Sequence, residues 1–405
     1  MSWDDVTGQA DAVAAVRRAA ETGEGLAHSW LITGPPGSGR SVLAYAFAAA
    51  LLARPGDEEA TEAQVRARTH PDLAVLNTER VVITIDEVRA LVAQSQFSPS
   101  VGRYRVVVIE DADRMPERTS NVLLKALEEP PPRTIWILCA PSEADLLPTI
   151  RSRTRSVRLR IPTVDEVAQL IARRDGVDAA TAHAVAREAQ SHIGMAHRLA
   201  ADPAARARRA RTLELALGIR SVSSAVLAAA ELIEVATADA KAITEQRDAE
   251  ERESTLRSLG IEPGGAVPPA LRGQLRIMEE DQKRRATRSL RDGLDRILTD
   301  LLSLYRDVVV LQLGVPAASA GLVNAGIADR LAQAANAATP AQTLGTLDAL
   351  AEARERLAGN VAPALALESA LISAVRPAIR TGAPSGGVAS GGVVSGGVVL
   401  GGGAS

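Results

Sequence analysis

The residues from Gly34 to Ser41 could hold a phosphate group. They read Gly-Pro-Pro-Gly-Ser-Gly-Arg-Ser, which follows the phosphate-loop pattern G-x-x-x-x-G-K-[ST] at every position but one. In such a loop the glycines permit a tight turn, and backbone N–H groups at a helix N-terminus face the anion. The hydroxyl at the position of Ser41 reaches a magnesium ion. The candidate nucleotide contacts are Gly34, Pro35, Pro36, Gly37, Ser38, Gly39, Arg40 and Ser41.

Arg40 stands where the pattern has lysine. A guanidinium is longer than an ammonium, planar and forked, so it can hold phosphate without fitting a loop shaped around lysine. The chain has lysine only at positions 125, 241 and 283, so Arg40 also fits a general preference for arginine. The pattern favours a P-loop fold and leaves open both a nucleotide site and a glycine turn without a ligand.

Glu110 and Asp111 follow the apolar run 105–109. In P-loop proteins the first acid here orients the magnesium shell, together with the hydroxyl at Ser41, and the second polarises the attacking water. The usual order is Asp-Glu, and a displacement of about 1 Å can cost roughly 100-fold in rate. Two interpretations stand: a residual role toward magnesium, or acids that end a strand in solvent.

Arginines at the alternate positions 151, 153 and 155 predict a cationic edge. The alternative is a basic strand that is simply solvated.

Apolar runs alternate with helical patterns around these residues, which predicts a parallel sheet covered on both faces. The expected strands are 30–33, 71–76, 81–85, 105–111, 134–139 and 157–161. The expected helices are 10–20, 42–52, 87–94, with Asp86 as its cap, and 116–129. Residues 54–71 are polar and predict a loop or an insertion.

The composition limits the classes of function. The 405-residue chain has a net charge of −3, so any contact with nucleic acid would be local or made through a larger assembly. Its single cysteine, Cys139, excludes an intramolecular disulfide and a multi-cysteine zinc site. Neither a signal peptide nor an apolar span of about 20 residues is present, so we expect a cytosolic protein.

Together these stretches resemble the AAA+ clamp-loader family of bacterial DNA polymerase III, and within it the delta-prime subunits. A P-loop alone would be weak evidence, whereas the run Leu-Leu-Lys-x-Leu-Glu-Glu-Pro-Pro is specific. The residues that carry the resemblance are Gly8-Gln9, 34–41, Ile109 to Asp113, 121–131 and Ile150-Arg151-Ser152-Arg153. The likeness is good over residues 1 to about 205, and beyond that it rests on position and helical character.

The resemblance implies an arginine finger. In this family a Ser-Arg-x motif carries it, and the motif corresponds to Ser152-Arg153-Thr154. Arg153 would reach the nucleotide of a neighbouring subunit, where its fork can pair phosphate oxygens. Such a finger supplies roughly 10³–10⁵ in rate. The implied partners are clamp-loader subunits of the gamma/tau and delta types in a hetero-pentamer, the sliding clamp, and primed DNA reached through the complex, in the cytoplasm at the replisome and without a membrane.

The departures from the family pattern imply a subunit that does not itself turn over ATP. They are Arg40, the order Glu110-Asp111, the absence of Thr or Asn at the sensor 1 tip in 139–142, and a sensor 2 motif that reads Gly194-Met195-Ala196-His197 with Arg198 one place late. We therefore expect at most a weak or degenerate ATP–magnesium site. Many members carry a zinc module in the segment corresponding to 51–70, which has no cysteine here, so we expect no zinc.

The resemblance and the helical patterns together predict four parts. These are an AAA+ P-loop core (1–162), a small helical lid (163–205) that opens with a capping box at Thr163, an all-α collar for oligomerisation (206–380) and a disordered Gly/Ser/Val-rich tail (381–405). Within the collar, 270–314 predicts a long amphipathic helix after a Gly- and Pro-containing break at 256–269.

Three functions are compatible with these features. The first is a clamp-loader stator that donates Arg153 to a neighbouring ATPase. The second is a self-sufficient AAA+ motor, in which Arg40, Ser41, Glu110 and Asp111 hydrolyse ATP. The third is a DNA-binding repair helper, which the near-neutral charge and the scarcity of aromatic residues disfavour.

Overall fold

The computed structural model describes residues 3–78, 81–258, 272–317, 320–359 and 361–375. Its N-terminal part contains a sheet in the order β2-β3-β4-β1-β5, in which every pair of neighbours is parallel. The strands are β1 (Ser29–Thr33), β2 (Leu73–Leu76), β3 (Arg105–Ile109), β4 (Thr134–Ala140) and β5 (Arg155–Arg158). The predicted α/β fold with a parallel sheet is confirmed.

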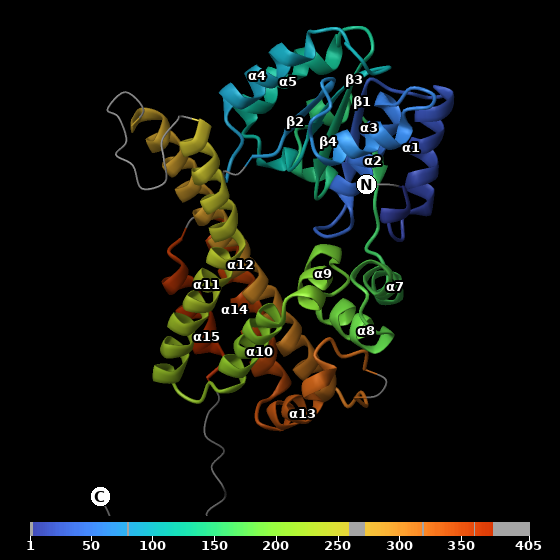
Figure 1. Ribbon diagram of the computed structural model, residues 1–405. Helices are drawn as coiled ribbons and strands as arrows, with labels where there is room; N and C mark the ends of the chain where they lie inside the picture. Colours follow the sequence, from blue (N-terminus) through green and yellow to red (C-terminus); the bar gives the residue numbers. More distant parts are fainter. Residues whose placement is uncertain (1–2, 79–80, 259–271, 318–319, 360, 376–405) are drawn as a thin grey trace, which may run out of the picture.

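Helices cover both faces of this sheet, as Figure 1 shows. Trp30 and Ile32 of β1 point into one core with α1 (Ala10–Thr22) and α2 (Arg40–Leu52). Leu31 points into the other core, with α4 (Ile85–Ser95) and α5 (Glu117–Glu128). The strands β1, β3 and β4 are buried on both sides, which explains why they read as continuous apolar runs rather than as alternating ones.

Two local predictions were wrong. The polar segment 54–71 contains the helix α3 (Glu58–Arg66), which buries Thr61 and Val65 four residues apart on one face. Residues 81–85 do not form a strand, and α4 begins earlier than expected. Its cap is Thr84 rather than Asp86, in a capping box with Glu87. The capping box at Thr84 stabilises the start of a helix here, whereas the short β-branched run 81–85 pairs with none of the described strands.

The last strand also differs from the prediction. β5 spans Arg155–Arg158 instead of 157–161, and of the three alternate arginines only Arg155 lies in it. Arg151 ends the short helix α6 (Pro148–Arg151), and Arg153 lies in the following turn. The three arginines therefore do not form one cationic edge, because the helical turn breaks the two-residue alternation.

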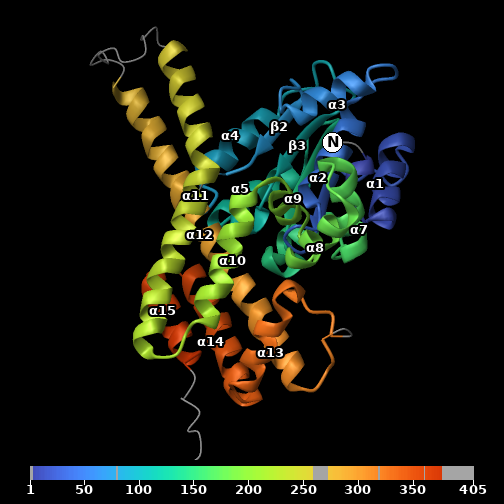
Figure 2. The same ribbon diagram turned by 60° about the horizontal axis from the view of Figure 1, so that its bottom comes forward.

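The remaining helices form two further cores. One is built by α7 (Val164–Asp175), α8 (Ala179–Glu188) and α9 (Ile193–Ala201), and the predicted capping box at Thr163 is present. The other is built by α10 (Pro203–Leu217), α11 (Val222–Ser258), α12 (Arg272–Gln312), α13 (Ala328–Asn336), α14 (Pro340–Ala358) and α15 (Pro363–Ser373). In Figures 1 and 2, α11 and α12 lie side by side.

The domain boundaries at 162, 205 and 380 stay predictions. The expected break at 256–269 lies outside the described residues except for 256–258, which belong to α11. The predicted tail 381–405 lies outside them entirely. None of the described helices combines the length and the apolarity that a membrane-crossing helix needs.

Candidate functional site

The predicted P-loop connects β1 to α2. Gly37 and Gly39 have φ angles of +79° and +94°, a region in which only glycine is unstrained. A methyl group at Gly37 would also lie 2.3 Å from Cγ of His192, the N-cap residue of α9. The amide of Ile193 donates to the carbonyl of Gly37 over 3.3 Å. The loop therefore has the shape that its glycines predict, and the helix α9 rests directly on it.

Arg40 is turned toward its own loop. Its Nη1 donates a 2.6 Å hydrogen bond to the carbonyl oxygen of Gly34, at the start of the P-loop. A guanidinium has more donors than this bond uses, so part of the fork stays available. The bond nevertheless ties the side chain to the backbone that a lysine would leave free.

Glu110 is almost fully buried and accepts hydrogen bonds from four side chains. Its donors are the Ser41 hydroxyl (2.8 Å), the Tyr45 hydroxyl (2.6 Å), the Arg68 guanidinium (3.0 Å) and the Asn77 amide (3.0 Å). Burial and the neighbouring Glu110 raise the pKa of Tyr45, so that its hydroxyl remains a donor. Burying a carboxylate is costly unless it is paired in this way.

Asp111 has a left-handed backbone, with φ of 53°. Its Oδ2 lies 2.8 Å from Nη2 of Arg288, in α12, and 3.5 Å from Nε of Arg114. Burial and the Asp111 charge raise the pKa of the neighbouring Asp113, one of whose oxygens is buried without a hydrogen-bond partner. The acid that would polarise water is thus engaged by a helix 177 residues away along the chain.

The donor set at these acids does not fit a magnesium ion. Magnesium requires oxygen ligands and water molecules in nearly octahedral geometry. Here the first acid is surrounded by hydrogen-bond donors and one guanidinium, and the second is paired with Arg288. A dication would have to displace these contacts or approach their positive charges closely.

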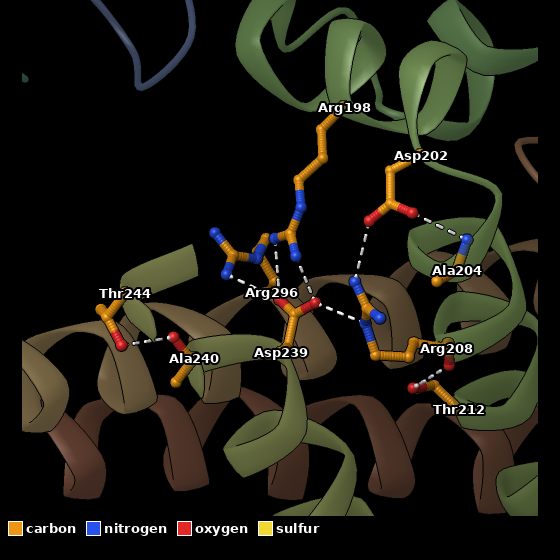
Figure 3. A network of polar contacts seen from close by, with 9 residues as sticks. All are labelled: Arg198, Asp202, Ala204, Arg208, Thr212, Asp239, Ala240, Thr244 and Arg296. Atoms are coloured by element: carbon orange, nitrogen blue, oxygen red, sulfur yellow. Dashed lines mark hydrogen bonds and ion pairs between the residues drawn. The ribbon is translucent and has the colours of Figure 1, made fainter. Parts of the chain in front are cut away.

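The arginine that stands one place past the sensor 2 position is engaged by a carboxylate of α11. Arg198 of α9 donates to both carboxylate oxygens of Asp239, in α11. Figure 3 shows Arg208 and Arg296 converging on the same carboxylate, over 2.6 and 3.0 Å. His197, at the sensor 2 position itself, is about half exposed and pairs with Asp175, the last residue of α7, at 2.8 Å.

Arg153 is about one third exposed and is held from two sides. Its Nε donates to Glu128, the last residue of α5, over 2.7 Å, and its Nη1 donates to the carbonyl of Thr149 over 2.7 Å. Its Nη1 also donates to the Ser152 hydroxyl over 3.1 Å, and its Nη2 lies 2.5 Å from Oε1 of Glu128. The guanidinium is therefore presented at the surface with a partner at each nitrogen and about one of its five N–H groups free.

The structure brings the P-loop, Glu110 and Asp111 to one edge of the sheet. Sequence reasoning missed five residues that contact these acids: Tyr45, Arg68, Asn77, Arg114 and Arg288. Helix spacing could have identified Tyr45, four residues after Ser41 on α2, and Asn77 directly follows the strand beside β3. No local signal points to Arg68 or Arg288.

Residues 8–163 match the family model described as DNA polymerase III, delta subunit. The DNA polymerase III subunit delta' of Pseudomonas aeruginosa is 40% identical over 136 residues, which are 31% of this chain and 41% of that protein. The gamma/tau subunit of Mycobacterium tuberculosis (strain H37Rv) is 29% identical over 180 residues, which are 42% of this chain and 31% of that protein.

This chain therefore spans less than half the length of these relatives. A solved DNA polymerase III gamma subunit-related protein of Thermotoga maritima covers 89% of this chain and 98% of its own, at 16% identity and a TM-score of 0.42. That likeness is too low to add to the fold assignment, which rests on the strand order and the P-loop. The resemblance found in the sequence is confirmed over its best-matched part: residues 8–163 are similar to the delta-prime subunits of DNA polymerase III.

Proposed function

We propose that this chain is a delta-prime-like stator of a DNA polymerase III clamp loader, which helps to load the sliding clamp onto primed DNA. Its partners are subunits of the gamma/tau and delta types. The observation that carries the proposal is a contrast between two sites. Arg153 is oriented at the surface by Glu128 and Thr149, whereas Glu110 and Asp111 are engaged by the chain's own side chains.

Arg153 acts in trans under this proposal. Its guanidinium pairs the phosphate oxygens of a nucleotide held by the neighbouring subunit, where charge develops during hydrolysis. A side chain that is already oriented loses less conformational freedom when it binds, which favours a fixed donor over a mobile one. The chain's own P-loop contributes a folded scaffold and no ATP turnover.

The competing function is a self-sufficient AAA+ motor subunit. The observation in its favour is that the P-loop retains its turn, its helix N-terminus and the contact between Ser41 and Glu110. It requires Arg40 to release Gly34 and Asp111 to release Arg288 during the cycle.

The test is the ATPase rate of a reconstituted clamp loader with clamp and primed DNA, comparing wild type with Arg153→Ala. Since a finger is worth roughly 10³–10⁵ at the site it serves, that site should fall silent in the variant. Arg151→Ala is the matched control, because Arg151 is exposed and lies two residues away. The isolated chain should release no phosphate. If Arg153→Ala leaves the ATPase rate of the complex unchanged and the isolated chain hydrolyses ATP, the chain is a motor subunit instead.

A further inference from the structure

We propose that the guanidinium groups of Arg68 and Arg288 take the place of the magnesium ion at this P-loop, so that the site excludes divalent metal. The proposal deepens the proposed function, on whose non-hydrolysing P-loop it rests. It assigns a role to two arginines that lie outside the P-loop and the acidic strand end, one of them in the long helix α12.

Arg68 neutralises the first acid. Its Nη2 lies 3.0 Å from Oε1 of Glu110, the oxygen that also accepts from Tyr45 and Asn77. The guanidinium carbon lies 5.3 Å from the centroid of the Tyr45 ring, a cation–π distance. Tyr45 therefore holds Arg68 and Glu110 at once. The helix α3 delivers this arginine, which follows it in a left-handed turn with φ of 58°.

Arg288 neutralises the second acid. Its Nη2 bonds Oδ2 of Asp111 at 2.8 Å, and its Nη1 donates to the carbonyl of Thr78, near the end of β2. The Arg288 side chain is about four fifths buried, because it lies between the residues that follow β2 and β3. The two bonds use both terminal nitrogens, which gives the fork a defined orientation that a single ion pair would not. Asp292 lies 3.7 Å from Nε of the same side chain.

These contacts oppose a metal ion in two ways. First, the carboxylates have less affinity for a dication when each already has a cation as its partner. The repulsion is stronger at Arg288, which is mostly buried, than at Arg68, whose side chain is about half exposed to water. Second, Oε1 of Glu110 already accepts hydrogen bonds from three side chains, those of Tyr45, Arg68 and Asn77, so a metal ion would have to displace donors from this oxygen. The residues that would form a magnesium shell are satisfied without one.

The exclusion of metal depends on tertiary contact between two cores. Arg68 belongs to the P-loop domain, whereas Arg288 comes from α12, which packs in the helical core with Leu294 and Leu298. The pairing of Asp111 thus exists only while α12 lies close to the residues that follow β2 and β3.

The test is a titration of the isolated full chain with Mn²⁺, a paramagnetic substitute for Mg²⁺, in which electron paramagnetic resonance reports the free ion. Wild type should show only weak binding at scattered surface carboxylates. The double variant Arg68→Ala/Arg288→Ala should gain one site that binds Mn²⁺ at least about tenfold more tightly. The matched control is Arg66→Ala/Arg284→Ala, which removes the same charge from the same two segments without touching either acid.

A third variant identifies the gained site. Adding Glu110→Gln to the double variant should abolish the new site, and thermal melting checks that all variants fold. The proposal would be overturned if wild type had a tight Mn²⁺ site that Glu110→Gln removes. It would also be overturned if Arg68→Ala/Arg288→Ala gained no Mn²⁺ site. Both readouts use the isolated chain and metal alone, so they are independent of the Arg153 experiment in the complex.

Discussion

Glu128 orients Arg153. Nε of the arginine donates to Oε1 of this carboxylate over 2.7 Å, and Nη2 lies 2.5 Å from the same oxygen. Glu128 ends the helix that carries the Leu-Leu-Lys-x-Leu-Glu-Glu-Pro-Pro run, whereas Arg153 lies 25 residues further along the chain. Two motifs that are separate in the sequence therefore form one unit, in which the end of α5 positions the proposed finger.

Glu128→Gln should weaken the finger without abolishing it. The pair is partly exposed, and exposed ion pairs contribute about 0.2–1 kcal/mol, so the ATPase rate of the reconstituted complex should fall by up to about fivefold. Glu129→Gln, which changes the adjacent carboxylate, is the control. In the background of Arg153→Ala the Glu128 change should have no further effect, since its only partner in this role is gone. An additive loss in the double variant would show that Glu128 acts elsewhere.

Arg40→Lys should not make the isolated chain an ATPase. The substitution restores the P-loop pattern, but Glu110 keeps its four donors and Asp111 keeps Arg288. The measurement is magnesium-dependent phosphate release by three purified proteins: wild type, Arg40→Lys and the double variant Arg40→Lys/Glu110→Gln. Turnover that appears with lysine and disappears with glutamine would mean that position 40 alone keeps the site silent.

Asp239→Asn should loosen the junction between α9 and α11. The amide cannot neutralise Arg198, Arg208 and Arg296, and removing one partner of a buried ion pair costs about 3–5 kcal/mol. Hydrogen exchange along α9 to α11 should accelerate, and the thermal transition should occur at a lower temperature. Asp202→Asn is the control, because its carboxylate is more exposed and should cost less. Equal effects of the two substitutions would argue against a special role for Asp239.

The carboxylate of Asp72 should make the free energy of unfolding depend on pH in the acidic range. Burial raises the pKa of this carboxyl, but the backbone N–H groups of residues 100–102 outweigh it and lower the pKa to about 2. An aspartate in the unfolded chain titrates near 3.9, so the unfolded state binds more protons between these values. The stabilisation is therefore complete above about pH 4 and is lost as the pH falls toward about 2.

The check is urea unfolding of wild type and Asp72→Asn between pH 2.5 and pH 6. The difference in unfolding free energy should be largest at the upper end and shrink toward the lower end. A difference that stays constant with pH would show that the carboxylate charge does not carry the effect.

The sequence by itself determined the parts that depend on local pattern. Strand runs buried on both faces, the glycines of the P-loop and the capping box at Thr163 predict elements that the structure contains. These features follow from backbone sterics and from periodic burial, which act over a few residues and can be read without tertiary information. Local pattern gave the wrong prediction for 54–71, because the polar helix in that segment buries only one narrow face.

Only the tertiary structure decided what the functional side chains contact. Arg68 reaches Glu110 from the turn after α3, and Arg288 reaches Asp111 from a helix 177 residues further along the chain. Arg198 is paired with Asp239. A charged side chain pairs with whichever opposite charge the packing brings within reach in a poorly solvated place, and that proximity is a property of the folded chain. The sequence therefore predicted the P-loop, whereas the packing of α3 and α12 near the strand ends determined which side chains contact Glu110 and Asp111.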